Sequence, residues 1–314
     1  MRTIRIVALC LCILLLAFLA PSPALVEGAA AEPLPALDPA LATPIPLSEN
    51  KGYAAKPENY RGELLYADPT LRVTIEKDRY LRTDIWIARV QCADPSQLRT
   101  ALAGKYGSKT TARPDVLAKH ANAVLAINGD FYSYDGWGVV LRQGHLYRER
   151  PDGYDDILLI DDAGDFHVVL KADEAEFRAA YDALGGAAEK GGSVVNALTF
   201  GPALIVEGEL AHDEFVRHDG GARPPAQRMV LAQDGPLSYL CICSEGPESK
   251  NSVGLTLAQM ADYVKTLNCT IAYNLDGGSS SAMVFDGEKI NAQSTGKVRS
   301  VADIVYFSSA LSGE

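Results

Sequence analysis

Short apolar runs recur along the chain from about residue 61 onwards, and their spacing predicts many β-strands. Residues 71–75 and 85–90 alternate apolar and polar side chains, which is typical of half-buried strands. Residues 123–127 form a continuous apolar run that ends in a polar turn, as expected of a buried strand. The same criteria predict further strands at 138–142, 157–160, 166–170, 194–200, 203–206, 228–232, 237–243, 270–273 and 301–307.

Three segments are expected to be helical. Residues 255–267 carry apolar side chains at helical spacing, residues 173–184 form a surface helix that ends at a Gly-Gly pair, and residues 114–123 form a short helix. Many short strands with a few helices, out of strict alternation, indicate an α+β fold class. We expect a single domain with a mixed, mostly short-stranded β-sheet and a few packing helices.

The N-terminus has the pattern of a targeting segment. Arg2 and Arg5 precede an apolar run at residues 6–20, and small residues follow, so residues 1–28 are predicted to be a signal peptide or an N-terminal anchor. The run is slightly short for the ~20 residues that span a bilayer, which favours a cleaved signal. The protein is therefore expected to be exported, either secreted or attached to the cell envelope. It would touch a membrane only through an uncleaved N-terminal segment.

A stretch rich in proline and alanine follows, at residues 29–60. This composition predicts an extended linker outside the core, which leaves residues 61–314 as the folded domain. The chain carries 29 Lys+Arg against 40 Asp+Glu, a formal net charge of −11. Nucleic acid is excluded as the expected partner, because a phosphate backbone calls for clustered basic residues.

Four cysteines lie beyond the N-terminal segment: Cys92, Cys241, Cys243 and Cys269. Export would permit disulfides, and four cysteines allow three pairings between which the sequence does not choose. Buried free thiols are the alternative. A zinc site is disfavoured because the paired C-x2-C spacing is absent.

Two segments, residues 126–132 and 273–281, share one design: an apolar strand that ends in a polar, glycine-containing turn. Glycines after a strand allow the backbone to turn sharply and to approach a ligand closely. Hydroxyl side chains and backbone N–H groups in such a turn can bind an anion. Asp130 and Asp276 would then project from strand ends into a common pocket. The alternative is that both segments are ordinary turns.

Two arginines are further candidates for binding an anion. Arg228 and Arg299 each stand before an apolar strand, where a planar guanidinium can bind phosphate or carboxylate. The sequence implies no required cofactor. Asp130, Asp276 and Asp303 are the residues that could share a Ca²⁺ ion, although no contiguous cation-binding loop is present.

In the order and spacing of these motifs the chain resembles the phosphodiester glycosidase family. The arginine of the family's Pro-Arg-Thr-Ala-Ile-Gly motif is kept as Arg228 in altered surroundings, and the arginine of a usual Asp-Gly-Arg motif near residues 244–247 is absent. The third glycine of the usual Gly-Gly-Gly turn is Ser279. The matching stretches are Asn128 to Tyr132, Phe200 to Leu204, Gln227-Arg228, Ser252 to Thr256, Asn274 to Ser280, Asn291 and Arg299 to Asp303.

The resemblance implies hydrolysis of a sugar-1-phosphodiester to a free sugar and a phosphomonoester, with a phosphate-linked saccharide or glycopolymer as substrate. It implies Asp276 and Asp130 as catalytic carboxylates. Two other functions remain open: a non-catalytic envelope module that binds carbohydrate or phosphoglycan, and a hydrolase of a different sugar-phosphate diester. The expected substrate-binding residues are Asn128, Gly129, Arg228, Asn274, Gly277, Gly278, Ser279, Ser280 and Arg299.

Overall fold

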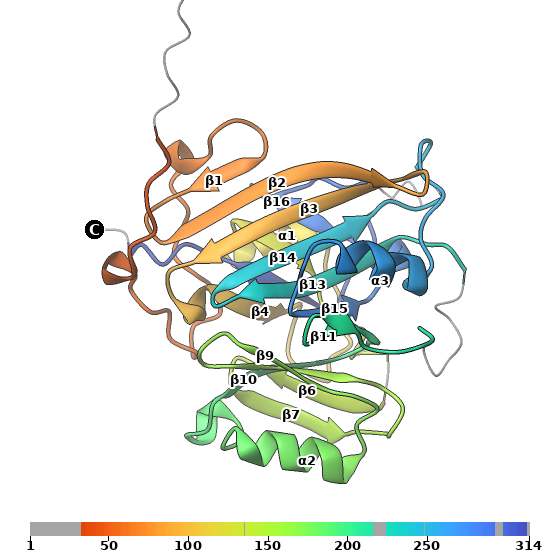
Figure 1. Cartoon of the computed structure of the whole chain (residues 1–314). Helices are drawn as coiled ribbons and strands as arrows, with labels where there is room; N and C mark the ends of the chain where they lie inside the picture. Colours follow the sequence, from red (N-terminus) through yellow and green to blue (C-terminus); the bar gives the residue numbers. More distant parts are fainter. Residues whose placement is uncertain (1–32, 135, 216–223, 248, 293–297, 313–314) are drawn as a thin grey trace, which may run out of the picture. The chain divides into compact units, whose positions relative to one another are not determined.

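Strand pairing organises the chain into three sheets (Figure 1). The computed structural model describes residues 33–134, 136–215, 224–247, 249–292 and 298–312, so the expected signal or anchor at residues 1–28 lies outside the described residues. Residues 34–314 cluster as one unit. None of the helices in the described part of the chain is long and apolar enough to cross a membrane.

The first sheet has eight strands and the other two have five each. Every ladder between the named strands is antiparallel. In spatial order, the first sheet consists of β1 (Leu65–Ala67), β2 (Leu71–Tyr80), β3 (Thr83–Cys92), β14 (Ser238–Ser244), β13 (Arg228–Gly235), β15 (Ile271–Leu275), β11 (Ala203–Val206) and β12 (Glu209–Leu210). The second consists of β7 (His145–Arg150), β6 (Gly138–Arg142), β10 (Val194–Thr199), β8 (Ile157–Asp161) and β9 (Phe166–Val169). The third consists of β17 (Glu288–Lys289), β16 (Met283–Phe285), β5 (Leu125–Asn128), β18 (Asp303–Phe307) and β4 (Leu98–Leu102).

The first and third sheets pack face to face around the largest apolar core. Leu231 and Cys241 of the first sheet and Ile127 and Val305 of the third are among its buried members. These side chains alternate along their strands with residues that face outward, as in other two-sheet packings. This arrangement brings strand ends from the two sheets close together at the edge of the core.

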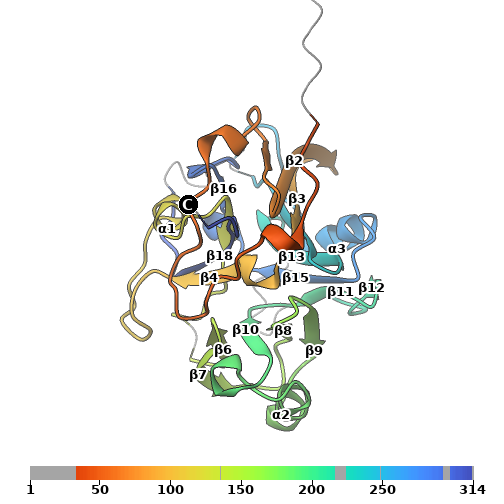
Figure 2. The same cartoon turned by 90° about the vertical axis from the view of Figure 1, so that its left-hand side faces the viewer.

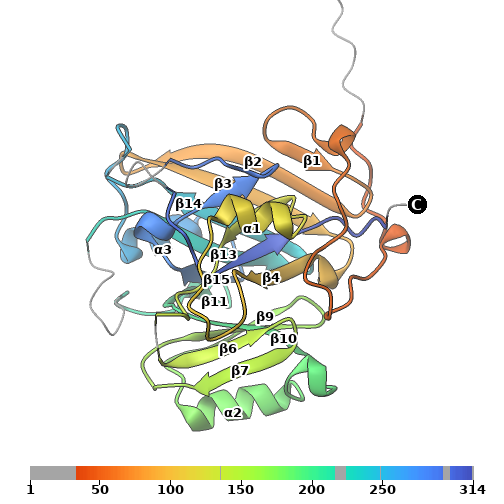
Figure 3. The same ribbon diagram turned by 180° about the vertical axis from the view of Figure 1, so that it is seen from behind.

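Helices cover the outer faces of all three sheets. The helix α3 (Leu257–Lys265) packs on the first sheet through Met260 and Val264, and α1 (Pro114–His120) packs on the third through Leu117. Figures 1 and 3 show α3 and α1 on opposite sides of the sandwich. The helix α2 (Glu174–Ala183) lies beneath the second sheet, as the side view in Figure 2 also shows.

The α+β class and the three expected helices are confirmed, and a strand forms at each of the segments expected to be one. Asp173 and Thr256 begin α2 and α3 with capping boxes, which satisfy N–H groups that each helix start leaves unpaired. The pattern of apolar positions did not predict short strands such as β16 or the polar strand β7. Pairing with neighbours, rather than apolar alternation, makes these segments strands.

The linker expected at residues 29–60 is a wrong prediction for residues 34–60, which lie against the domain. Arg99 on β4 is fully buried and donates hydrogen bonds to the backbone carbonyls of Ile45 (3.2 Å), Pro46 (3.0 Å) and Glu49 (2.7 Å). A proline-rich segment has few N–H donors but keeps its carbonyl acceptors. A buried guanidinium with five donors therefore holds it in place.

Candidate active site

The two glycine-containing turns singled out in the sequence come together at one end of the sandwich. Asn128 ends β5 in the third sheet, and Asp276 follows β15 in the first. Asn128 is fully buried, and its Nδ2 donates hydrogen bonds to the carbonyl of Asp276 (2.7 Å) and of Gly129 (3.1 Å). Its Oδ1 accepts a hydrogen bond of 3.0 Å from the N–H of Ala282. Asn128 therefore ties the two turns together.

A narrow cleft opens between these turns and the segment that leads into β18. Its cavity volume is about 10 Å³, which is room for about one water molecule. A ligand larger than water would therefore bind largely at the open mouth. The residues that line the cleft are Gly129, Asp130, Phe131, Tyr134, Asp276, Ser280, Arg299, Ser300, Val301 and Ala302.

Arg299 supplies positive charge to this cleft and is only partly buried. Its Nη1 donates a hydrogen bond of 3.1 Å to the hydroxyl of Ser279, so the proton of that hydroxyl can point to another acceptor. Its guanidinium carbon lies 5.6 Å from the ring centroid of Phe131, and the Phe131 ring stacks on Tyr134 at 4.3 Å. The cleft thus combines a cation with an aromatic wall.

Asp276 is the carboxylate most accessible from the cleft. Its residue is only partly buried, whereas the neighbouring strand residues 272–275 are buried. Its backbone carbonyl is held by Asn128, which places the side chain at the strand end. The antiparallel register sets Leu275 opposite Met229, so the start of β13 lies beside Asp276.

Arg228, the first residue of β13, lies behind the turn rather than across the cleft. It is 6% exposed, and its Nε and Nη2 donate to the carbonyls of Leu255 (2.9 Å) and Pro224 (2.8 Å). Its Nη1 lies 3.8 Å from the position that a Cβ on Gly277 would take. Arg228 therefore supports the turn from the inside, and its predicted contact with phosphate stays a prediction.

The turn itself uses much of its backbone hydrogen-bonding capacity internally. The N–H of Gly278 donates to Gln227, and those of Ser280 and Ser281 donate to carbonyls of the two glycines. Gly278 has φ of +57°, a conformation that glycine adopts without strain. The predicted anion site is thus left with fewer backbone donors than the sequence suggested. Asn274 is buried, and its Nδ2 donates 2.7 Å to the carbonyl of Gly201, away from the turn.

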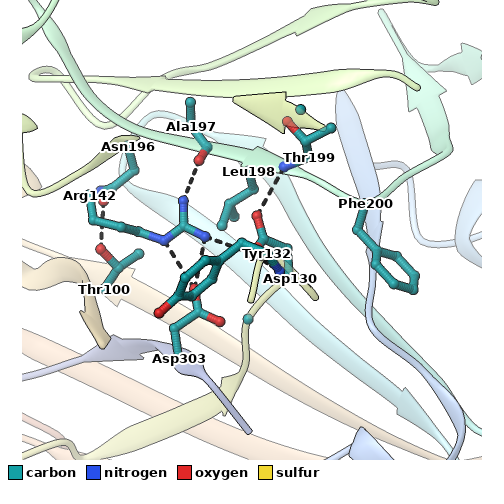
Figure 4. A network of polar contacts seen from close by, with 12 residues as sticks. Thr100, Asp130, Tyr132, Arg142, Asn196, Ala197, Leu198, Thr199, Phe200 and Asp303 are labelled. Atoms are coloured by element: carbon teal, nitrogen blue, oxygen red, sulfur yellow. Dashed lines mark hydrogen bonds and ion pairs between the residues drawn. The ribbon is translucent and has the colours of Figure 1, made fainter. Parts of the chain in front are cut away.

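Asp130 lies at the cleft wall, but its side chain is fully buried in an ion network (Figure 4). One carboxylate oxygen lies 2.8 Å from Nη2 of Arg142 and accepts from the N–H of Tyr132 at 3.2 Å. The other accepts from the N–H of Thr199 at 3.0 Å. Three donors thus hold the Asp130 carboxylate.

Arg142, at the end of β6, is the important residue of this region that sequence reasoning missed. Its Nε and Nη2 both donate to one oxygen of Asp303, at 3.0 and 2.8 Å, and its Nη1 donates to the backbone carbonyl of Ala197 (Figure 4). An arginine that ends a wholly apolar strand is the signal that could have revealed it. A guanidinium buried in this way needs carboxylate partners.

The other oxygen of Asp303 is buried and has no hydrogen-bond partner among the described residues. Burial raises the pKa of Asp303 to about 7, with Asp130 and Asp276 acting in the same direction and Arg142 opposing them. The carboxyl lies directly beneath Gly129, where a Cβ would come within 2.3 Å of that oxygen. Glycine at position 129 is therefore required by close packing.

The Ca²⁺ ion that Asp130, Asp276 and Asp303 could share stays a prediction. Among the described residues no cluster of three or more His, Cys, Asp or Glu side chains is arranged to hold a metal ion. Between Asp130 and Asp303 the positive charge is the guanidinium of Arg142.

The four cysteines of the described domain are free and buried. Burial raises the pKa of each thiol, to about 12 for Cys269 and further for the other three. A thiol that stays protonated is a poor nucleophile and a poor zinc ligand. The structure thus supports packing roles for these residues.

A β-rich scaffold that brings a carboxylate, an arginine and aromatic side chains to one cleft has polar and apolar groups in the combination expected of a small-molecule binding site. The sequence of residues 121–308 matches the model of the phosphodiester glycosidase family. The chain therefore belongs to the phosphodiester glycosidase family.

Solved structures share the fold. The catalytic domain of zebrafish N-acetylglucosamine-1-phosphodiester α-N-acetylglucosaminidase, auto-inhibited by its pro-peptide, is similar with a TM-score of 0.59 and 16% identity, over 83% of this chain and 87% of that chain. A hypothetical protein from Synechocystis is similar with a TM-score of 0.53 and 14% identity, over 76% of this chain and 62% of that chain. No curated protein matches the sequence.

Proposed function

We propose that this protein hydrolyses a sugar-1-phosphodiester, releasing the free sugar and a phosphomonoester, and that Asp276 is its catalytic carboxylate. One observation carries the proposal. Asp276 and Arg299 line the same cleft and are both only partly buried, whereas the side chain of Asp130, the other carboxylate of the cleft wall, is fully buried. Asp130 then stabilises the cleft wall, and Asp276 acts on the sugar.

The chemistry suits a cleft with one accessible carboxylate. Cleavage of the bond between the anomeric carbon and the phosphate oxygen raises the charge of the leaving phosphate from one minus towards two. The second pKa of a phosphate monoester is about 6, so the leaving group needs little help from a general acid. What it needs is positive charge and hydrogen-bond donors where the new charge develops. In this proposal Arg299 and the hydroxyl of Ser279, which accepts a hydrogen bond from Arg299, would supply both.

Asp276 would stabilise the positive charge that develops at the anomeric carbon, and it would either attack that carbon or activate water. The stacked rings of Phe131 and Tyr134 offer an apolar face to the sugar. The Tyr134 side chain is well exposed at the rim, so it can contact a saccharide that enters from solvent.

In this proposal three residues expected from the sequence to bind substrate take structural roles instead. They are Asn128, Asn274 and Arg228. All three are buried and donate hydrogen bonds to backbone carbonyls. They would hold the two turns in place, and the direct contacts to substrate would fall to Arg299 and Ser279, which are only partly buried. The N-terminal pattern further supports export, with a secreted or envelope-attached enzyme that meets phosphate-linked saccharides outside the cytoplasm.

The test replaces Asp276 by asparagine and measures the release of sugar from a series of glycosyl phosphodiesters. We expect kcat to fall by at least about a hundredfold, with unchanged thermal unfolding. Asp286→Asn is the matched control, because Asp286 is exposed at the opposite end of β16 from the cleft. Turnover by Asp276→Asn at the rate of the parent protein would remove Asp276 from the mechanism.

The products decide between the proposal and its alternatives. Free sugar with a phosphomonoester supports it. Sugar phosphate with an alcohol would indicate a different diester hydrolase. Saturable binding of the glycosyl phosphodiesters without turnover of any of them would indicate a binding module.

A further inference from the structure

Three charged side chains from three separate elements meet beneath the cleft (Figure 4). Asp130 follows β5, Arg142 ends β6 of the second sheet, and Asp303 begins β18. The side chain of Arg142 is 2% exposed, and those of both aspartates are fully buried. Each carboxylate has an oxygen 2.8 Å from Nη2 of Arg142. We call these three residues the buried triad.

The triad has one positive group for two carboxyl groups, so its charge depends on one proton. Asp130 accepts hydrogen bonds from three donors, whereas one oxygen of Asp303 accepts none from the described residues, so a proton on the triad is best placed on that oxygen. A proton on that oxygen makes the triad neutral. Loss of the proton leaves one uncompensated negative charge at a buried position, which is costly.

We propose that Asp303 is a specificity-determining residue of the cleft. Its protonated form permits binding of an anionic phosphodiester, and its ionised form weakens that binding. Arg142 holds the Asp303 carboxyl in position. The inference rests on the proposed function for the identity of the natural ligand. Its physical basis is the position of Asp303 directly beneath Gly129, which lines the cleft.

Among the described residues, few charged or titratable groups face Asp303 from the surrounding elements. Arg142 comes from β6, Asp130 and Tyr132 come from the loop after β5, and Asp276 comes from the turn after β15. Residue 102, its partner on β4, is an uncharged leucine. Burial raises the pKa of Tyr132, so this phenol stays neutral. Burial also raises the pKa of Asp303 to about 7, so its charge changes within the physiological range.

The experiment measures binding of dimethyl phosphate by calorimetry at pH 6 and pH 8. This probe is a monoanion at both values, so its own charge does not change. An added charge several ångströms from the bound anion is expected to weaken binding by about tenfold between pH 6 and pH 8. Asp303→Asn imitates the protonated carboxyl in shape and charge. Its dissociation constant should stay flat and match the parent value at pH 6.

The inference would be overturned by a dissociation constant of the parent protein that does not change with pH, or by an equal change in Asp303→Asn. Absence of binding at both pH values would also contradict it. If the variant does not fold, carbon-13 NMR of aspartate carboxyls in the parent protein replaces it. One carboxyl should titrate near pH 7, and the absence of such a titration would overturn the inference.

The binding measurement is independent of turnover. A protein that binds dimethyl phosphate as described but hydrolyses no glycosyl phosphodiester would contradict the proposed function alone. A protein that hydrolyses these diesters but shows no effect of Asp303 on binding would contradict this inference alone.

Discussion

Asn128 and Asp276 are 148 positions apart in the sequence, and a hydrogen bond of 2.7 Å joins the side chain of the first to the backbone carbonyl of the second. The bond connects the third sheet to the first at the cleft, so the distance between the two glycine-containing turns depends on it. Both residues are buried or partly buried, so loss of the donor is expected to lower the free energy of unfolding.

Replacement of Asn128 by aspartate should therefore impair both stability and activity. The new side chain places an acceptor against the carbonyl of Asp276, and we expect the free energy of unfolding to fall by about 1–3 kcal/mol. Urea denaturation and kcat/KM on a glycosyl phosphodiester are the measurements. Asn251→Asp, at an exposed position, is the matched control. A variant of Asn128 as stable and as active as the parent protein would show that the turns are held by other contacts.

Gly129→Ala tests the close packing over Asp303. The added methyl group would lie 2.3–2.6 Å from the atoms of that carboxyl group, which Arg142 holds in place. Overpacking of this kind costs about 1–3 kcal/mol. Gly136→Ala is the control, because a Cβ there meets nothing within 4 Å. Equal melting temperatures of the two variants would contradict the predicted clash.

Arg299→Ala should discriminate between charged and neutral substrates. Loss of the guanidinium removes the positive charge expected to face phosphate, so kcat on a glycosyl phosphodiester should fall by about 10²–10³-fold. The loss on a neutral aryl glycoside should be much smaller. Arg89→Ala, at an exposed position on β3, serves as control. Losses of the same size on both substrates would indicate that Arg299 positions the cleft without binding phosphate.

The stability of the protein should depend on pH through Asp303. Its pKa is about 7 in the folded chain, against about 3.9 for an unperturbed aspartate. Between these values the folded state binds more protons than the unfolded state, so stability from this group is lost as pH rises from about 4 to 7. The free energy of unfolding of the parent protein relative to Asp303→Asn should fall by at most about 1.4 kcal/mol per pH unit. A difference that is constant over this range would contradict the prediction.

The local pattern was a reliable guide where burial and strand alternation coincide. Residues 85–90 and 138–142 formed the expected strands, and the helix at 255–267 formed with shorter ends. The pattern failed where tertiary contacts decide the structure. Residues 34–60 have the composition of a linker, but Arg99 and other residues of the folded domain bind their carbonyl groups. A sequence window does not contain those partners.

The sequence alone determined the helices, the two glycine-containing turns and the strands with a clear apolar pattern, because apolar periodicity and glycine act over a few neighbouring residues. It also carried the motifs that indicate the family. Only the tertiary structure decided which aspartate faces solvent and which is neutralised. Arg142 pairs with Asp130 from 12 positions away and with Asp303 from 161, and no local pattern encodes such a contact. The environment of a carboxylate depends on the groups that folding places around it, so its role in the cleft is a property of the assembled sheets.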